Sequence, residues 1–261
     1  MRSTNWIRET CLDGNRPIDS TEYLGVAELQ ALERNMSAWL ERKAELISSV
    51  IAGRDILEVG CGIGSLTRRL SSQGLNVVAL DSSELCLKYA CRKRAPNVVY
   101  LLDDIRRPIH LASYKNSFDT VLMSDVLEHI DDENAALTNA GQLLRRRGVL
   151  VITVPAFGFL FSEQDRKIGH LRRYTKRRLV KRLAEAGFGA DYCRYWNLPG
   201  LIGWLIYCKL MKRSVSTISS ALGMRLYGSW LRLESLARLP VGLTLVVRAR
   251  RRAKLATGTP T

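Results

Sequence analysis

The spacing of hydrophobic residues predicts a regular alternation of helices and strands along most of the chain. Between Glu28 and Ile51, apolar residues recur at helical spacing with charged residues between them, which predicts one amphipathic helix. Short apolar runs then alternate with further helical patterns. The runs predict strands at 55–59, 76–80, 97–102, 118–123, 149–154, 188–196 and 243–247, and the patterns predict helices at 65–72, 83–94, 134–144 and 175–186.

This alternation is typical of an α/β fold with a doubly wound, mostly parallel sheet and helices on both faces. Right-handed crossovers place the carboxyl ends of parallel strands at one edge of such a sheet. The polar residues that end several of the predicted strands are therefore expected to lie together. Because ligands bind at this edge in open α/β sheets, the sequence points to a ligand site there.

The chain reads as one structural domain with five parts. These are an N-terminal helical cap (1–50), an α/β core (51–196), a helical insertion (197–240), the last core strand (241–250) and a basic, flexible tail (251–261). The insertion carries Trp204, Tyr207 and Trp230 among leucines and basic residues. Because it lies between the last two strands, we interpret it as a lid over an apolar acceptor. The same composition suits contact with an anionic lipid surface.

The formal net charge of +15 is concentrated in the last third of the chain. Residues 166–261 hold 21 of the 40 Lys and Arg residues but only 3 of the 25 Asp and Glu residues. Such a region favours an anionic partner, although a solvated basic face is the plainer explanation. The first ten residues contain no apolar signal segment, and the apolar run at 198–211 is shorter than the ~20 residues of a spanning helix. We therefore expect a cytoplasmic protein that can touch a membrane peripherally.

A glycine-rich loop follows the first predicted strand. Glu58 lies near the end of that strand, two residues before Gly60, and Gly60-Cys61-Gly62-Ile63-Gly64 leads into a helix, where the main chain can approach a ligand closely. Ser65 stands where a dinucleotide fingerprint has its last glycine. Asp81 ends the second strand, where a carboxylate can accept both hydroxyls of a ribose. These features predict a nucleoside-type cofactor; the alternative is a tight turn that only packs the helix on the sheet.

The motifs resemble the S-adenosylmethionine-dependent methyltransferases of the Rossmann-like class. The resemblance is carried by the segment 58–64, by Asp81 and Asp104, and by Ser124-Asp125-Val126-Leu127-Glu128-His129. It covers residues 50–195 and the final strand, and it is specific for the cofactor rather than for the acceptor. It implies a sheet of seven strands with the last one antiparallel, and S-adenosylmethionine as the cofactor.

The resemblance also implies a role for each part of the cofactor site. Glu58 and the glycines would hold the methionine end, Asp81 the ribose, and Asp104 the adenine amino group, with Asp103 as the alternative because the register is ambiguous by one. Residues 124–126 would close over the sulfonium. The expected cofactor contacts are Glu58, Gly60, Cys61, Gly62, Gly64, Asp81, Ser82, Asp103, Asp104, Ile105, Ser124, Asp125 and Val126.

Methylation of a hydroxyl requires a group that removes its proton. His129 is one candidate, since it follows the fourth strand. Asp125, Glu128 and His129 could also form a cluster for a divalent ion, and the ubiquinone-pathway O-methyltransferases, which this segment resembles, use such a cluster. We expect no metal here, because a Glu-His pair at this position also serves simply to cap a loop and helix.

A second candidate lies between residues 161 and 175, which follow the fifth strand. This segment resembles one in bacterial methyltransferases that act on glycans, lipid-linked molecules and secondary metabolites. On that basis His170 is expected to be the general base and Asp165 to belong to the catalytic group. Substrate contacts are expected from Arg172, Arg173, Tyr174 and Trp204. The alternative is that Arg172, Arg173 and Tyr174 only orient the following helix.

The sequence therefore predicts a methyltransferase for an anionic or amphipathic small molecule, most simply an O-methyltransferase for a sugar, lipid-linked or secondary-metabolite hydroxyl. One alternative is C- or N-methylation, including a prenyl-diphosphate acceptor that would bind the basic region. A nucleic-acid methyltransferase is disfavoured, because no base-flipping tetrapeptide of the Asn-Pro-Pro-Tyr type follows the fourth strand. A non-catalytic cofactor-binding protein is the remaining alternative.

Overall fold

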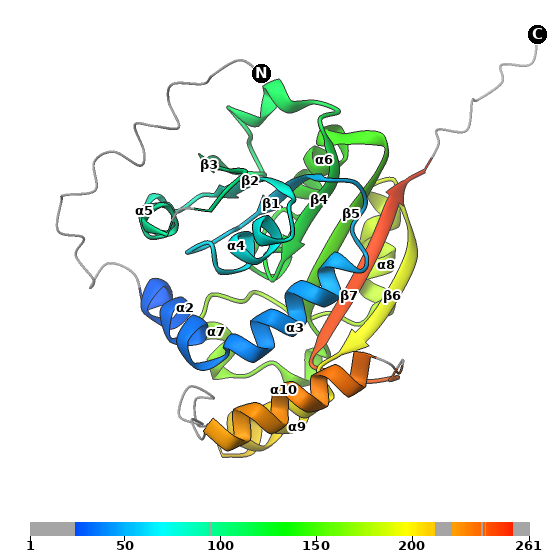
Figure 1. The fold of residues 1–261 in the computed structure, drawn as a ribbon. Coiled ribbons are helices and arrows are strands. Elements are labelled where there is room, and N and C mark those ends of the chain that lie inside the picture. Colours follow the sequence, from blue (N-terminus) through cyan, green and yellow to red (C-terminus); the bar gives the residue numbers. More distant parts are fainter. Residues whose placement is uncertain (1–23, 94, 212–220, 236, 238, 253–261) are drawn as a thin grey trace, which may run out of the picture.

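The computed structural model describes residues 24–93, 95–211, 221–235, 237 and 239–252, which fold around a seven-stranded sheet (Figure 1). The strand order across the sheet is β3-β2-β1-β4-β5-β7-β6. The strands are β1 (Asp55–Val59), β2 (Asn76–Asp81), β3 (Val98–Leu102), β4 (Phe118–Ser124), β5 (Leu144–Pro155), β6 (Phe188–Trp196) and β7 (Thr244–Arg251).

The strand directions match the expected fold. β1 pairs in parallel with β2 and β4, β2 with β3, and β4 with β5, whereas β7 is antiparallel to both β5 and β6. The prediction of a doubly wound, mostly parallel sheet with an antiparallel last strand is confirmed. The carboxyl ends of β1 to β6 therefore share one edge, and we call it the ligand edge.

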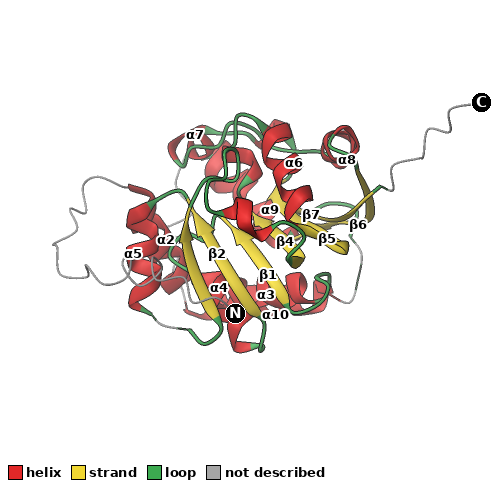
Figure 2. Ribbon diagram, turned by 90° about the horizontal axis from the view of Figure 1, so that it is seen from above, coloured by secondary structure: helices red, strands yellow, loops and turns green. Residues whose placement is uncertain are grey.

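Helices cover both faces of the sheet (Figure 2). One buried cluster joins the sheet to α6 (Glu133–Leu143) and α8 (Lys176–Glu185). The other joins it to α3 (Ser37–Ser48), α4 (Ser65–Ser72), α5 (Glu84–Arg92) and α10 (Ala221–Ser235). The apolar faces of these helices thus pack on the two sides of one central sheet and form two hydrophobic layers.

The predicted helix at 28–51 is in fact two helices, α2 (Leu24–Asn35) and α3. They are separated at Met36, whose φ of −117° and ψ of 28° lie outside the helical range. The amide of Leu40 still bonds to the Met36 carbonyl, so the break costs only one residue of regular helix. The apolar spacing runs across this break unchanged, which is why the sequence pattern did not reveal it.

Two further elements differ from the prediction. β5 begins at Leu144 rather than at residue 149, because a register shift against β4 between Phe118 and Thr120 lets the chain pair earlier. The segment between residues 161 and 175, for which the sequence predicts no helix, contains α7 (Glu163–Lys167). This helix of one turn depends on a capping box made by Ser162 and Asp165, and it has too few residues to show an apolar period.

The segment between β6 and β7 is helical where the structure describes it. It contains α9 (Leu198–Trp204), the π-helical turn η4 (Leu205–Leu210) and α10, which lie together at the ligand edge (Figure 1). The Glu234 carboxylate of α10 accepts hydrogen bonds from the amides of Asn197 and Leu198, at 2.7 and 3.1 Å, and so fixes α10 to the start of α9. Among the described residues, no helix is long and apolar enough to cross a membrane.

Parts of the expected organisation lie outside the described residues. These parts are the first 23 residues of the expected N-terminal cap, residues 212–220 of the insertion and residues 253–261 of the expected tail.

Candidate functional site

The glycine loop after β1 has the backbone conformation that only glycine adopts without strain. Gly60, Gly62 and Gly64 have φ values of +70°, +54° and +75°. A Cβ atom on Gly60 would lie 2.5 Å from Val126 Cγ2, and one on Gly64 would lie 2.9 Å from the Tyr100 hydroxyl. The three glycines are therefore required by the loop itself. They leave its main chain open to close approach by a ligand at the start of α4.

Asp81 ties the glycine loop to the end of β2. Its two carboxylate oxygens accept hydrogen bonds from the amides of Gly62, at 2.7 Å, and of Ser83, at 2.8 Å. Burial raises the pKa of Asp81, although these amides favour its charged form. Asp81 thus positions the loop and still lies at the strand end where a ribose is expected; the adjacent Ser82 is exposed.

Glu58 is buried beneath the loop. It is 2% exposed, and the Thr67 hydroxyl of α4 donates to its carboxylate at 2.7 Å. Burial raises the pKa of Glu58 to about 7, against the effects of Thr67 and of the Lys43 ammonium group. Cys61 is also buried, and burial raises the pKa of its thiol well above the usual value, so it is no ready nucleophile.

The structure separates the roles of Asp103 and Asp104, which the sequence left open. Asp103 is 9% exposed, and its carboxylate accepts backbone hydrogen bonds from the amides of residues 104, 109, 110 and 111. It folds the loop after β3 and has no edge free for an adenine. Asp104 is half-buried, which makes it the better candidate for contact with the base. Ile105 is buried beside it.

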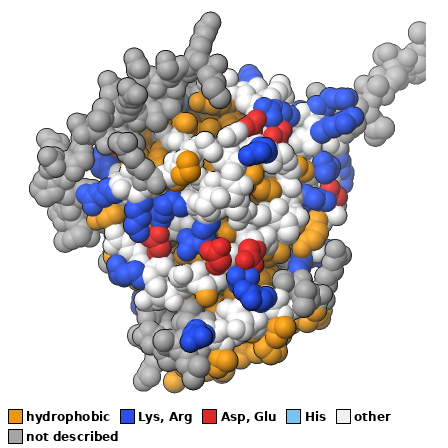
Figure 3. Space-filling model, viewed as in Figure 1, with side chains coloured by type: hydrophobic (Ala, Val, Ile, Leu, Met, Phe, Trp, Pro, Cys, Tyr) orange, Lys and Arg blue, Asp and Glu red, His pale blue; other side chains and the backbone are white. Residues whose placement is uncertain are grey.

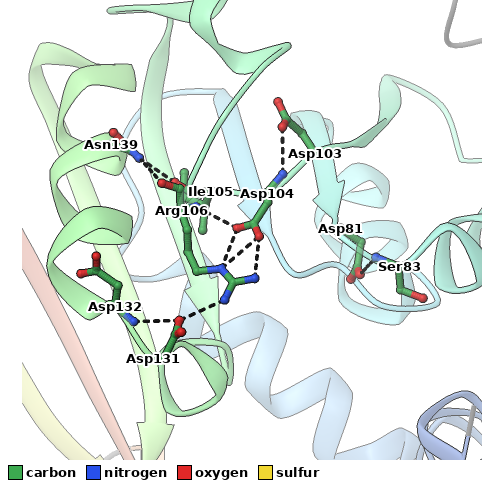
Figure 4. Close-up of polar contacts among 9 residues, drawn as sticks. All are labelled: Asp81, Ser83, Asp103, Asp104, Ile105, Arg106, Asp131, Asp132 and Asn139. Carbon is green, nitrogen blue, oxygen red and sulfur yellow. Dashed lines mark hydrogen bonds and ion pairs between the residues drawn. The ribbon is translucent and has the colours of Figure 1, made fainter.

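Asp104 already has a cationic partner (Figure 4). Both of its carboxylate oxygens bind the Arg106 guanidinium, at 2.7 to 3.1 Å, and Arg106 also contacts Asp131 at 2.9 Å. The hydrogen bonds from Arg106 hold the pKa of Asp104 below its usual range. Asp104 is therefore a charged acceptor in a fixed orientation.

The residues after β4 form the centre of the ligand edge. Asp125 adopts φ +55°, an unusual value for a non-glycine residue. Its carboxylate accepts a hydrogen bond from the Thr153 hydroxyl at 3.0 Å and forms an ion pair with Lys43. Ser124 contacts the same Thr153 hydroxyl at 3.2 Å, and Val126 covers Gly60. This segment is thus held against both the glycine loop and β5.

Lys43 is a site residue that the sequence analysis missed. It lies on α3, is 4% exposed and places its ammonium group at Asp125, with the Trp39 ring 4.9 Å away. A buried lysine at the junction of the glycine loop and β4 can neutralise acidic groups there. The available signal was its position: Lys43 falls on the same helix face as Leu40 and Ile47, where a core residue is expected.

His170 and Asp165 form a hydrogen-bonded pair after β5. The Nδ1 atom of His170 lies 2.9 Å from the Asp165 carboxylate, and the His170 side chain is 10% exposed. Burial acts to raise the pKa of Asp165, but hydrogen bonds from His170 and Arg173 hold it below its usual value. Asp165 itself is fully buried, so its position is that of a residue that orients His170.

Glu128 and His129 lie against this pair. The Nε2 atom of His170 is 3.8 Å from a Glu128 oxygen, and the two imidazole rings are 4.7 Å apart, edge to face. Glu128 is fully buried, and neither of its carboxylate oxygens accepts a hydrogen bond from a described residue. Burial, with a smaller effect of Asp125, raises the pKa of Glu128 well above its usual value.

Glu128, His129 and His170 also have the arrangement of a potential metal site. One potential ligand atom each from Glu128, His129 and His170 lies within 4.8 Å of the other two. The grouping differs from the alternative drawn from the sequence, because Asp125 faces Lys43 and its place is taken by His170. Two imidazoles and one carboxylate suit zinc or another transition ion better than magnesium, which prefers oxygen ligands.

The structure gives Arg172, Arg173 and Tyr174 partners inside the protein. Tyr174 is fully buried, and its hydroxyl donates to Glu133 at 2.6 Å. Arg172 binds the same carboxylate at 3.1 Å, and Arg173 is 4% exposed and binds Asp165 at 2.8 Å. The contacts therefore favour the alternative interpretation, in which these residues hold the segment between β5 and α8, over direct contact with the acceptor.

Trp204 connects α9 to the same network. Its ring lies over the Arg173 guanidinium at 4.3 Å, and its indole N–H donates to the Leu160 carbonyl at 3.2 Å. The predicted lid thus lies on the segment that carries His170, and one face of Trp204 is already covered by Arg173.

Part of the chain that carries this site is similar to known proteins. Residues 57–152 match the family model described as a methyltransferase domain. The ubiquinone biosynthesis O-methyltransferase of Caulobacter vibrioides is 30% identical over 161 residues, which cover 60% of this chain and 54% of that protein. The human mitochondrial protein of the same name is 33% identical over 129 residues, or 44% of this chain and 34% of that protein. The chain thus spans about half the length of the curated bacterial relative.

Solved structures share the fold. Phosphoethanolamine N-methyltransferase 2 of Haemonchus contortus, in complex with phosphomonomethylethanolamine and S-adenosylhomocysteine, has a TM-score of 0.60 and 20% identity over 97% of this chain and 61% of its own. An S-adenosylmethionine-dependent methyltransferase of Thermotoga maritima has a TM-score of 0.58 and 17% identity over 88% of this chain and 97% of its own.

Proposed function

Because residues 57–152 form a methyltransferase domain of the Rossmann-like, S-adenosylmethionine-dependent class, we propose that the chain transfers a methyl group to a hydroxyl oxygen of a small molecule. The acceptor hydroxyl belongs to a sugar, a lipid-linked molecule or a secondary metabolite. The observation that carries this proposal is the His170–Asp165 pair at the ligand edge. The curated relatives are named as O-methyltransferases, which supports oxygen as the methylated atom.

The cofactor is S-adenosylmethionine, which supplies a methyl group already activated on a sulfonium. The glycine loop with Glu58 and Lys43 receives the methionine end, Asp81 the ribose and Asp104 the adenine. Lys43 supplies the positive charge that a methionine carboxylate needs in a buried position. The residues at 124–126 close the cofactor site on the side of β4.

His170 acts as the general base. The Asp165 carboxylate accepts a hydrogen bond, so the proton of a neutral His170 ring is assigned to Nδ1. The lone pair then lies on Nε2, which takes the proton of the acceptor hydroxyl as its oxygen bonds to the methyl carbon. Asp165 stabilises the imidazolium that results. Positioning of the two reactants supplies the remainder of the rate enhancement.

The internal partners of Arg172 and Arg173 favour this reaction over methylation of a prenyl diphosphate. A diphosphate needs cations free to bind it, and these two guanidinium groups are held by Glu133 and Asp165. A hydroxyl acceptor needs one base and an apolar surface, which His170 and the α9 segment supply.

A metal-assisted form of the same reaction is the second candidate. The two unpartnered oxygens of Glu128 beside His129 and His170 favour it. In that form the three side chains would hold a divalent ion that lowers the pKa of the acceptor hydroxyl. His170 would then be a ligand and no longer the base.

The experiment is transfer of a labelled methyl group from S-adenosylmethionine into a metabolite extract, with the product identified by mass. Cofactor binding is measured in parallel by calorimetry for the wild type, Asp81→Ala and Gly62→Val. We expect a methylated oxygen in the product and weaker cofactor binding by both variants. Unchanged affinity in both variants would refute the cofactor site, and a methylated nitrogen or carbon would refute the proposed reaction.

A further inference from the structure

The part of the molecule formed by α9, η4 and α10 exposes an unusual amount of apolar surface. Of the large hydrophobic side chains that are exposed among the described residues, eight lie in this short segment: Ile202, Leu205, Ile206, Leu210, Met211, Leu226, Trp230 and Leu233. Only Leu102 and Ile109 are exposed in the described part before β5 ends. Figure 3 shows hydrophobic atoms gathered along the lower rim, where Figure 1 places α9 and α10. Monomeric soluble proteins rarely expose large apolar patches without a binding role.

The exposed residues of α10 form a regular stripe. Leu226, Trp230 and Leu233 are 63%, 50% and 63% exposed and follow one another at intervals of four and three residues, which places them on one helix face. The adjacent face holds α10 on the protein, through the buried Leu231 and Glu234. The apolar stripe is therefore the outward face of an anchored helix.

Charge along this segment has one sign. Between residues 197 and 242 the sequence contains a single acidic residue, Glu234, which is 4% exposed and bound to the amides of Asn197 and Leu198. Arg225 and Arg232 are exposed and lie one position before Leu226 and Leu233 along α10. A row of basic side chains thus follows the apolar stripe, with no exposed carboxylate from the described residues of this segment beside it.

We propose that the face formed by the exposed apolar residues of α9, η4 and α10 binds the surface of a membrane that contains anionic lipids. Leucines beside a half-exposed tryptophan suit the boundary between headgroups and acyl chains, where the apolar ring enters and the indole N–H stays hydrated. Arg225 can extend its apolar stem along that boundary and reach a lipid phosphate. The basic row selects anionic membranes over neutral ones.

This face adjoins the ligand edge. Trp204, at the end of α9, covers Arg173 in the network that holds His170. A membrane bound to the face would therefore lie beside the segment that carries the base. The surface itself does not depend on the proposed methyl transfer, because lipid binding can be measured without cofactor or acceptor.

The test is flotation of the full chain with vesicles of phosphatidylcholine alone and of phosphatidylcholine with about one third phosphatidylglycerol, at low and high salt. The wild type should float with the anionic vesicles at low salt and much less with the neutral ones. Leu226→Gln/Leu233→Gln should lower the partition coefficient about tenfold for each leucine. Ile109→Gln is the matched control. Ile109 is 76% exposed after β3, which lies at the opposite end of the sheet from β6, so this variant should bind as the wild type does.

A separate variant tests the contribution of the basic residues to membrane binding. Arg225→Gln should weaken binding about fivefold at low salt and leave it unchanged at high salt. Lys115→Gln, an exposed lysine that precedes the start of β4, should have no effect. On binding, the tryptophan fluorescence of the wild type should shift to the blue, and Trp230→Phe should remove this shift.

Three outcomes would overturn the proposal. The first is the absence of flotation of the wild type with anionic vesicles. The second is equal flotation of the wild type and of Leu226→Gln/Leu233→Gln. The third is a concentration-dependent dimer that Leu226→Gln/Leu233→Gln dissociates while neither protein floats, which would make the face a contact between two copies of the chain.

Discussion

The cofactor side and the acceptor side of the ligand edge are built by different means. Around the glycine loop, main-chain atoms make the decisive contacts: three glycines with positive φ, and amides that bind Asp81 and Asp103. On the acceptor side, contacts between side chains dominate, since Asp165 binds both His170 and Arg173. The first region is fixed by conformation and the second by paired charges.

This difference determines how each region responds to mutation. A loop held by main-chain contacts tolerates side-chain changes, except where a glycine is lost or a carboxylate that accepts hydrogen bonds from backbone amides is lost. In a buried network of charges, removing one partner leaves another unpaired in the interior, which costs several kcal/mol. Variants on the acceptor side should therefore be more damaging and less specific, and their interpretation needs matched controls.

The largest effect is expected from His170→Ala. Loss of a general base should lower kcat by about 100- to 10,000-fold, while the dissociation constant of the cofactor stays within about twofold, because His170 belongs to the acceptor side. Single-turnover kinetics and calorimetry measure the two quantities.

His129→Gln is the matched control for that substitution. It changes the neighbouring imidazole, whose Nδ1 lies 3.2 Å from the Gly169 carbonyl oxygen, and it should lower kcat less than tenfold. An equally large loss in both variants would assign the two rings to one shared function and would contradict a single base.

A second contrast concerns the buried acid beneath the glycine loop. The pKa of Glu58 is raised from 4.5 to about 7 in the folded protein, so the folded state retains a proton that the unfolded chain releases as the pH rises through this interval. Its contribution to the free energy of unfolding is complete below pH 4.5 and falls by on the order of 3 kcal/mol by pH 7.

Glu58→Gln removes this titration. The difference in unfolding free energy between Glu58→Gln and the wild type should therefore grow in favour of the variant between pH 4.5 and 7, measured by urea denaturation at several pH values. Glu84→Gln, an exposed acid at the start of α5, should follow the wild type at every pH. A constant difference between Glu58→Gln and the wild type would show that the Glu58 pKa is not raised.

The sequence predicted the backbone-built side more completely than the side-chain-built one. Strand ends, the glycine loop and Asp81 follow one another within short stretches of chain, so their spacing reveals their geometry. By contrast, Tyr174 and Arg172 on the acceptor side reach Glu133 across the fold. Lys43, which the sequence did not reveal on the cofactor side, reaches Asp125 in the same way. No local pattern encodes such pairs, and the partner of Arg172, Glu133, is distant in sequence. Asp165, the partner of Arg173, is only eight residues away, but the spacing alone does not show that the two side chains are paired.

The break at Met36 and the single turn of α7 show a second limit. A one-residue interruption leaves the apolar period of a long helix almost unchanged, and five residues are too few to display a period at all. The spacing of Ser162 and Asp165 is itself a capping signal, but the sequence predicts a catalytic role for Asp165 and no helix at this point.

A smaller effect is expected on the cofactor side from Asp81→Asn. The amide keeps the shape of the carboxylate but offers only one oxygen to the amides of Gly62 and Ser83, and it loses the charge that strengthens both bonds. The dissociation constant of the cofactor should rise about tenfold, with kcat at saturating cofactor within about twofold of the wild type. Calorimetry measures the first and steady-state kinetics the second. A fall in kcat without a change in cofactor affinity would show that Asp81 acts on the acceptor and does not bind the cofactor.

Removal of divalent ions is expected to leave the activity unchanged. Metal binding by Glu128 requires its charged form, and burial raises the pKa of this carboxyl well above its usual value, so an ion would first have to displace a proton. The His170–Asp165 pair meets the need for a base without that cost. Activity after treatment with a chelator should stay within about twofold of the untreated enzyme, measured in buffer free of metal. A loss of activity that zinc or magnesium restores would assign Glu128, His129 and His170 to a metal and would make the acceptor side an ion-dependent site.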